Sequence, residues 1–136
     1  MKKILLPAFL VGITTLLISM ALSFLFMKFP SVAMDYANPN LIRPWKDPLM
    51  SLFLVYPFIQ GLILAWAWNK SKSLFQGISI GRGIKFGLSI WLIASVPGMF
   101  VTYSCFPISL LTVISWTVDG LVNGPVAGMI LAKINK

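Results

Sequence analysis

The sequence predicts an all-α integral membrane protein: a four-helix bundle of antiparallel transmembrane spans with both termini in the cytoplasm. Hydrophobic residues make up 58% of the 136-residue chain and charged residues only 10%, whereas about a quarter of the residues in a soluble domain are charged. The mean hydropathy is +0.90. A spanning helix needs about 20 mostly apolar residues, so four spans with their connections occupy nearly the whole length. We therefore expect a single transmembrane domain, 1–136.

Four apolar runs define the expected spans, which cover about 4–27, 49–68, 86–103 and 108–132. The first run follows two lysines and resembles the start of a signal peptide, but it is longer than a typical signal-peptide core, so we interpret it as a retained span. Pro57 in the second run and Pro97-Gly98 in the third predict bends in these helices. Trp66 and Trp68 end the second run, where aromatic residues are typical of the membrane interface.

Two polar connections are expected on opposite sides of the membrane. The outer loop, 28–48, contains four prolines, which exclude a continuous helix. Its length fits either a solvated connector or a lid or docking surface. The basic loop, 69–85, is rich in glycine, but no strand precedes it and it lacks the Lys-Ser/Thr ending of a nucleotide-binding loop. We interpret it as a flexible segment that faces lipid headgroups.

Basic residues near the span ends predict the orientation. Eight of them fall at the termini and in the basic loop (Lys2, Lys3, Lys70, Lys72, Arg82, Lys85, Lys133 and Lys136), and three fall in the outer loop (Lys28, Arg43 and Lys46). Because positively charged segments stay in the cytoplasm, we expect a multi-pass protein of the cell membrane with both termini inside. This orientation and anionic lipids account for the net charge of +8, and we expect no nucleic-acid binding.

Asp119 is the only carboxylate inside an apolar run. A charge at mid-membrane depth costs roughly 2.5 to 3.5 kcal/mol on insertion scales, so such a residue usually faces protein or water and has a function. The polar residues of the fourth span share one face of the helix: Ser109, Thr112, Ser115, Trp116, Asp119 and Asn123. Gly120, Gly124 and Gly128 lie beside this stripe and predict close helix packing, with a possible dimer surface.

Polar residues of the other spans are expected at the depth of Asp119. A rise of about 1.5 Å per residue brings Thr15, Gln60 and Ser95 to its level. Tyr56 shares a helix face with Gln60, and Thr15, Ser19 and Ser23 recur every four residues on the first span.

We predict a midplane site for a proton, a cation or a small polar solute, formed by Asp119, Asn123, Gln60 and Tyr56. The structural alternative, given equal weight, is that Asp119 only makes hydrogen bonds to Gln60, Asn123 or Tyr56 and that these faces hold the bundle together.

The composition excludes several kinds of site. The chain has no histidine and one cysteine, Cys105, so it cannot form an internal disulfide or a Cys/His metal or haem site. We expect no cofactor and no metal. Neither a Ser-His pair nor a pair of carboxylates within the spans is present, and we expect a protein that is not an enzyme.

The alternative to transport is a non-catalytic accessory or assembly subunit of a larger membrane complex. In either case we expect the chain to contact the lipid bilayer and to form a homo-oligomer or bind a partner membrane subunit. In architecture, four spans in this length resemble small multidrug transporters and fluoride channels. The multidrug group has its membrane carboxylate in the first helix, whereas Asp119 is in the fourth, and no motif of either group is present.

Overall fold

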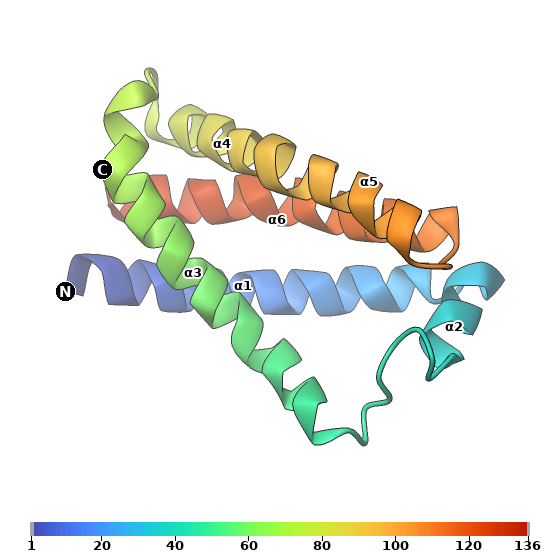
Figure 1. The fold of residues 1–136 in the computed structure, drawn as a ribbon. Helices are drawn as coiled ribbons and strands as arrows, with labels where there is room; N and C mark the ends of the chain where they lie inside the picture. The colour runs from blue at the N-terminus through green and yellow to red at the C-terminus, as the bar shows by residue number, and fades with distance from the viewer. Residues whose placement is uncertain (1, 136) are drawn as a thin grey trace.

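The computed structural model describes residues 2–135 (Figure 1), and these residues form helices and contain no strand. The elements are α1 (Lys2–Phe26), α2 (Pro30–Ala37), η1 (Pro48–Met50), α3 (Ser51–Ser71), η2 (Lys72–Leu74), α4 (Ser79–Ile90), η3 (Trp91–Ser95), α5 (Val96–Cys105) and α6 (Leu110–Ile134). Four segments are long and apolar enough to cross a membrane: Ile4–Phe26, Pro48–Leu74, Ser79–Cys105 and Leu110–Ile134. The all-α fold with four candidate spans is therefore confirmed.

The first and last helices lie side by side and run in opposite directions, so both chain termini lie at one end of the molecule (Figure 1). We call this end, which contains residues 4–8, 68–86 and 131–135, the terminal end. The opposite end contains α2 and the turn at 105–109, and we call it the loop end. Helix α3 crosses α1 obliquely, and its first turns diverge from the other spans toward the loop end (Figure 1).

Glycines allow helices α4 and α6 to approach closely. On α4 and α6, Gly87 faces Gly124 and Gly83 faces Gly128, so that a Cβ at any of these positions would overlap the backbone of the opposite helix. Such small-residue contacts are typical of membrane helix interfaces. Gly124 and Gly128 thus pack within the chain, as the close-packing prediction required. Because α4 covers Gly124 and Gly128, these two glycines are not available for the expected dimer surface.

The apolar core is concentrated at the terminal end. Its buried members are Ala8, Val11, Leu64, Ala65, Trp68, Phe86, Ala127, Leu131 and Ala132. Trp68 is 0% exposed, and its indole N–H donates to the carbonyl of Asn135 at 2.8 Å. Trp68 therefore packs inside the bundle at the end of its span, whereas Trp66, on the other side of the helix, is 58% exposed.

The connections are more helical than their composition predicts. Helix α3 and η2 continue to Leu74 and α4 begins at Ser79, which corrects the basic loop 69–85 to a turn at 75–78. Lysine and serine are compatible with a helix, and the chain reverses only at Gly77, whose φ of 115° favours glycine. The outer loop contains α2, which begins at Pro30 because proline is tolerated in a first helical turn.

The third span contains a π-helical segment just before its proline. The N–H of Val96 donates to the carbonyl of Trp91, five residues back, at the end of η3. Pro97 follows in the first turn of α5. The interruption that the sequence predicts at Pro97-Gly98 therefore lies one turn earlier, because the wider turn forms where proline cannot supply a backbone donor. By contrast, Pro57 and Pro125 lie inside continuous helices.

Candidate functional site

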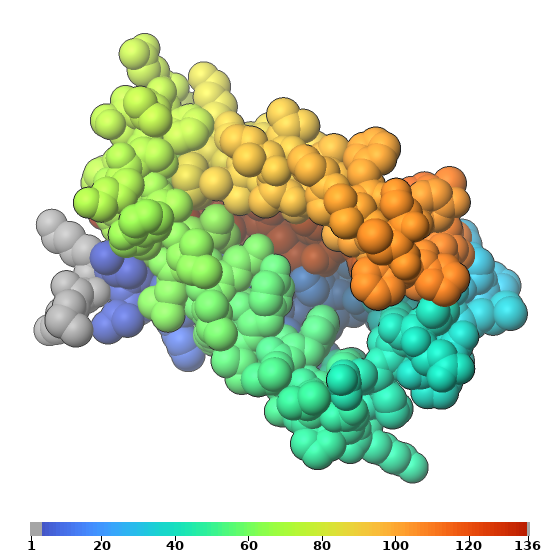
Figure 2. Space-filling view, viewed as in Figure 1, coloured from blue at the N-terminus to red at the C-terminus, as the bar shows by residue number. Residues whose placement is uncertain are grey.

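A cavity of about 290 Å³ lies on the loop-end side of the apolar core, among α1, α3, η3 and α6. Figure 2 shows it as a hollow between α3 and α5, with α6 and α1 visible at its floor. All four residues of the predicted site, Tyr56, Gln60, Asp119 and Asn123, line it, as do Thr15 and Ser95. Residues from four separate spans therefore meet in one cavity, which is open sideways between α3 and α5.

The carboxylate of Asp119 is held by neutral hydrogen-bond donors. The Ser19 hydroxyl donates to Asp119 Oδ2 at 3.1 Å, and Asn123 Nδ2 donates to Asp119 Oδ1 at 3.0 Å. Asn123 Nδ2 also donates to Ser19 Oγ at 2.8 Å, which closes a ring of three side chains. No lysine or arginine lines the cavity. Among the described residues, the carboxylate therefore has hydrogen bonds but no positive partner.

Asn123 has an acceptor that the protein does not use. Its Oδ1 atom is buried and has no hydrogen-bond partner among the described residues. A buried acceptor without a donor costs about 1–3 kcal/mol. The amide nitrogen of Asn123 is bonded to Asp119 and Ser19, so the unused acceptor belongs to the same side chain that holds the carboxylate.

Helix α2 closes the cavity toward the loop end. The Trp116 indole N–H donates to the hydroxyl of Tyr36 at 2.8 Å, and both side chains line the cavity. Next to them, Asp35 Oδ2 accepts from the Ser109 N–H at 2.8 Å and from the Thr112 hydroxyl at 2.6 Å. Asp35 thereby supplies an acceptor at the start of α6, where backbone donors lack partners. We call this part of the outer loop, residues 30–37, the lid, because its Tyr36 forms the loop-end wall of the cavity.

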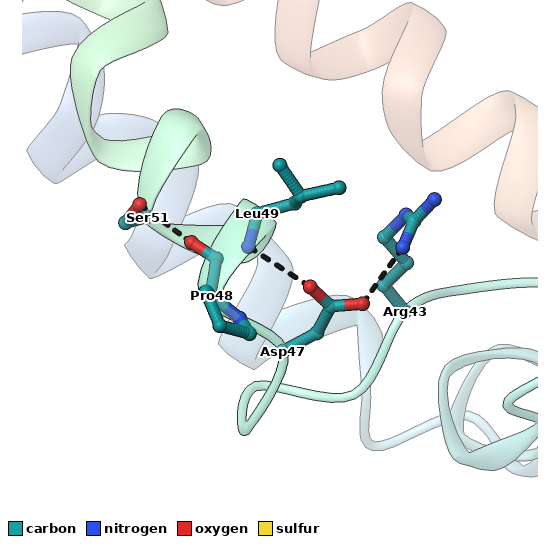
Figure 3. Close-up of polar contacts among 5 residues, drawn as sticks. All are labelled: Arg43, Asp47, Pro48, Leu49 and Ser51. Atoms are coloured by element: carbon teal, nitrogen blue, oxygen red, sulfur yellow. Dashed lines mark hydrogen bonds and ion pairs between the residues drawn. The ribbon is translucent and has the colours of Figure 1, made fainter.

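The other half of the outer loop is fixed to the start of α3 (Figure 3). Asp47 Oδ2 forms an ion pair with Arg43 Nη1 at 2.7 Å, and Asp47 Oδ1 accepts from the Leu49 N–H at 2.9 Å. The Ser51 hydroxyl donates to the carbonyl of Pro48 at 2.7 Å. The loop therefore joins α6 to α3 across the loop end, although its proline content also fits a solvated connector.

The docking of α2 depends on the charge of Asp35. Partial burial alone would raise the pKa of Asp35, but the hydrogen bonds from Ser109 and Thr112 outweigh it, so the pKa lies below the usual value of 3.8. A carboxylate with a depressed pKa stabilises the folded state above its unfolded pKa, and this stabilisation is lost as the pH falls through the folded pKa. Docking is thus complete at neutral pH and weakens in acid below 3.8.

Replacement of Asp35 is expected to release α2 from α6. Asp35→Ala removes the acceptor of the Ser109 N–H and the Thr112 hydroxyl, which should cost about 1–2 kcal/mol. Protection of the α2 amides from hydrogen–deuterium exchange, measured relative to the intrinsic rate at each pH, should fall in the variant at neutral pH, and in the wild type only in strong acid. Asp47→Ala, which changes the other half of the loop, should leave exchange at 30–37 unchanged. Equal exchange in Asp35→Ala and wild type would refute this role of Asp35.

Several residues of the site were not singled out from the sequence. Ser19 and Asn123 donate hydrogen bonds to Asp119, whereas Gln60 and Tyr56 do not. The repeat of hydroxyl residues on the first span, to which Ser19 belongs, could have indicated its role. Trp116 lies on the polar stripe of the fourth span. No pattern in the sequence pointed to Tyr36, because a tyrosine in a proline-rich loop has no periodicity to follow.

Comparison of the chain with protein-family models, with curated proteins and with solved structures found no match. Functional inference therefore starts from the cavity itself: one carboxylate, neutral donors and aromatic walls between four candidate membrane spans.

Proposed function

We propose that this multi-pass protein binds a small cation, a proton included, at Asp119 and carries it across the cell membrane. The observation that supports the proposal is the unpaired carboxylate at the floor of the cavity. Within residues 2–135, the hydrogen-bond partners of Asp119 are Ser19 and Asn123, and no lysine or arginine of this part of the chain lines the cavity. Because a charge at membrane depth is costly, the compensating positive charge would come from the bound ion.

The packing leaves the cavity open mainly at its side. An apolar core fills the terminal end, and α2 closes the loop end through Tyr36 and Trp116. If the basic residues at the terminal end face the cytoplasm, the core blocks the path inward and α2 covers the path outward. Transport would then require the helices to bend or shift near the core.

The helices contain features that permit such a change next to the site. The π-helical segment Trp91–Ser95 contributes Trp91 and Ser95 to the cavity wall, and π-helical turns are frequent at functional sites. Pro57, which also lines the cavity, and Pro125 each remove one backbone hydrogen bond from their helix. Broken or weakened helices near the midplane are typical of transporters.

Flux measurements in vesicles test this function. Protein in liposomes should carry protons, followed with a trapped pH-sensitive dye, or take up radiolabelled Na⁺, K⁺ or an organic ammonium ion, and Asp119→Asn should abolish the flux. Asp47→Asn is the matched control, because it makes the same chemical change at an ion pair outside the cavity, and it should retain wild-type flux. Equal flux in Asp119→Asn and wild type, or no flux of any of these ions in the wild type, would overturn the proposal.

The sideways opening favours a second candidate, an accessory or assembly subunit. Apolar side chains such as Ile63 on α3 and Phe100 on α5 are more than half exposed, and a partner helix could fill the gap between these helices (Figure 2). Purification in mild detergent followed by mass spectrometry distinguishes the two, because a subunit of a complex would co-purify with a defined partner, whereas a transporter alone or as a homo-oligomer would not.

A further inference from the structure

We propose that the ion bound in this cavity is a small organic ammonium ion, with one positive charge and apolar substituents. This inference rests on the proposed binding of a cation at Asp119. It concerns the chemical class of the ligand. Three features of the cavity favour this class: its aromatic lining, its oxygen atoms and its shape.

Aromatic side chains form much of the cavity wall. Six aromatic side chains line it: Phe26, Tyr36, Phe53, Tyr56, Trp91 and Trp116. Aromatic faces attract cations electrostatically, and cages of such rings recognise alkylated ammonium groups. A cavity that combines one carboxylate with several rings therefore offers both a counter-charge and surfaces for the apolar substituents of an ammonium ion.

The two tryptophans are held in position by internal hydrogen bonds. The Trp91 indole N–H donates to the carbonyl of Thr117 at 2.9 Å, and the Trp116 indole N–H donates to Tyr36 at 2.8 Å. Neither N–H is free to donate to a ligand, so these side chains offer rings and not hydrogen-bond donors. This arrangement suits a ligand that has positive charge and little capacity to accept hydrogen bonds.

The cavity wall offers a bare metal ion a single charged group, and its other side-chain oxygen atoms are neutral. Hard cations such as Ca²⁺ take about six to eight oxygen ligands. Asp119 supplies the only carboxylate in the lining, and each of its oxygens already accepts a hydrogen bond. The Thr15 and Ser115 hydroxyls donate to carbonyls of their own helices at 2.8 and 2.7 Å. Within residues 2–135, no group of three His, Cys, Asp or Glu residues could hold a metal ion.

The volume of the cavity and the direction of its opening both fit a small amphiphilic ligand. The volume of about 290 Å³ lies at the lower end of ligand cavities, which span roughly 300–1,000 Å³, so it fits an ion with a handful of carbon atoms. The opening between α3 and α5 (Figure 2) faces sideways, where the membrane would lie. Apolar substituents can enter by this route while the charge moves to Asp119.

Binding of choline to the full-length protein in detergent tests the inference. Choline carries a trimethylammonium group, and 3,3-dimethylbutan-1-ol is its uncharged isostere. Calorimetric titration should show choline binding at least about 10-fold more tightly than the alcohol, since a charge-assisted contact contributes about 1.5–3 kcal/mol and 1.4 kcal/mol is a factor of ten. Asp119→Asn should remove this preference, and neither NaCl nor KCl should compete with choline.

A pair of variants at Tyr56 tests the role of the aromatic ring. Tyr56 lines the cavity and is 56% exposed, so its replacement should leave the packed core intact. Tyr56→Leu should weaken choline binding by about 2- to 30-fold, the range that corresponds to one cation–π contact. Tyr56→Phe, which retains the ring, should bind choline as the wild type does.

The outcomes separate this inference from the function on which it rests. Direct binding of Na⁺ or K⁺ that depends on Asp119, without choline binding, would overturn the ammonium ligand and leave cation binding in place. Absence of choline, Na⁺ and K⁺ binding, together with no proton flux that depends on Asp119, would overturn both. Equal binding of choline and its isostere, choline binding unaffected by Asp119→Asn, or Tyr56→Leu binding as tightly as Tyr56→Phe would overturn the inference.

Discussion

Asp119→Asn is expected to raise the thermal stability of the ligand-free protein and to abolish its stabilisation by cations. The wild-type carboxylate lies among neutral partners, Ser19 and Asn123. Removal of its charge should therefore increase the free energy of unfolding by about 1–3 kcal/mol, on the scale of the insertion cost of a mid-membrane carboxylate. A ligand at 100 times its dissociation constant should stabilise the wild type by about 2.7 kcal/mol and the variant by nothing.

Thermal unfolding in detergent, with and without a saturating cation, measures both effects. Ser19→Ala is a useful companion variant, because it removes one hydrogen bond to the carboxylate but leaves the charge, and it should lower stability while cation-dependent stabilisation persists. A purely structural Asp119 would behave in the opposite way. Asp119→Asn would then be less stable than the wild type, and cations would have no effect on either protein.

Gly87→Leu is expected to disrupt the packing of α4 against α6. A Cβ at position 87 would overlap the carbonyl group of Gly124 and the nitrogen of Pro125, and backbone atoms cannot move aside as a flexible side chain can. Overpacking in a well-packed interior costs about 1–3 kcal/mol and occasionally more. Because the added side chain meets backbone, we expect the upper end of this range, and a loss of folded protein in detergent.

Gly98→Leu on the same span is the matched control, because a Cβ at position 98 meets no atom within 4 Å. It should fold as the wild type does or be slightly more stable, since leucine has a higher helix propensity than glycine. Size-exclusion profiles and circular dichroism on heating measure both variants. If Gly87→Leu and Gly98→Leu behave alike, the glycine contact between α4 and α6 does not determine the packing of these helices.

The four spans and the convergence on Asp119 could be predicted because both depend on local properties of the chain. Span length follows from the thickness of the membrane, and depth follows from the rise per residue of a helix. These two quantities place Gln60, Ser95 and Asp119 at one level before any packing is known. The structure places all three in the wall of one cavity.

The partners of Asp119 and the lid could not be predicted in the same way. Depth does not specify how each helix is rotated, and rotation brings Ser19 to Asp119 and leaves Tyr56 and Gln60 without a hydrogen bond to it. The position of the outer loop depends on a contact between segments that are distant in sequence, because Asp35 binds the start of α6. The burial of Trp68 could not be predicted either. Its position at the end of a span predicts a side chain at the membrane interface, whereas the packing of α4 and α6 buries it.

By itself, the sequence determined that this is an all-α protein with four candidate membrane spans and that one carboxylate, Asp119, lies near the middle of the fourth. Only the tertiary structure decided that Ser19 and Asn123 bind that carboxylate, that α2 forms one wall of the cavity, and that the glycine ridge is used within the chain. The physical reason is that the length of a span and the depth of a residue in it follow from counting residues along the chain. By contrast, helix rotation, crossing and lid docking depend on which surfaces fit one another in space.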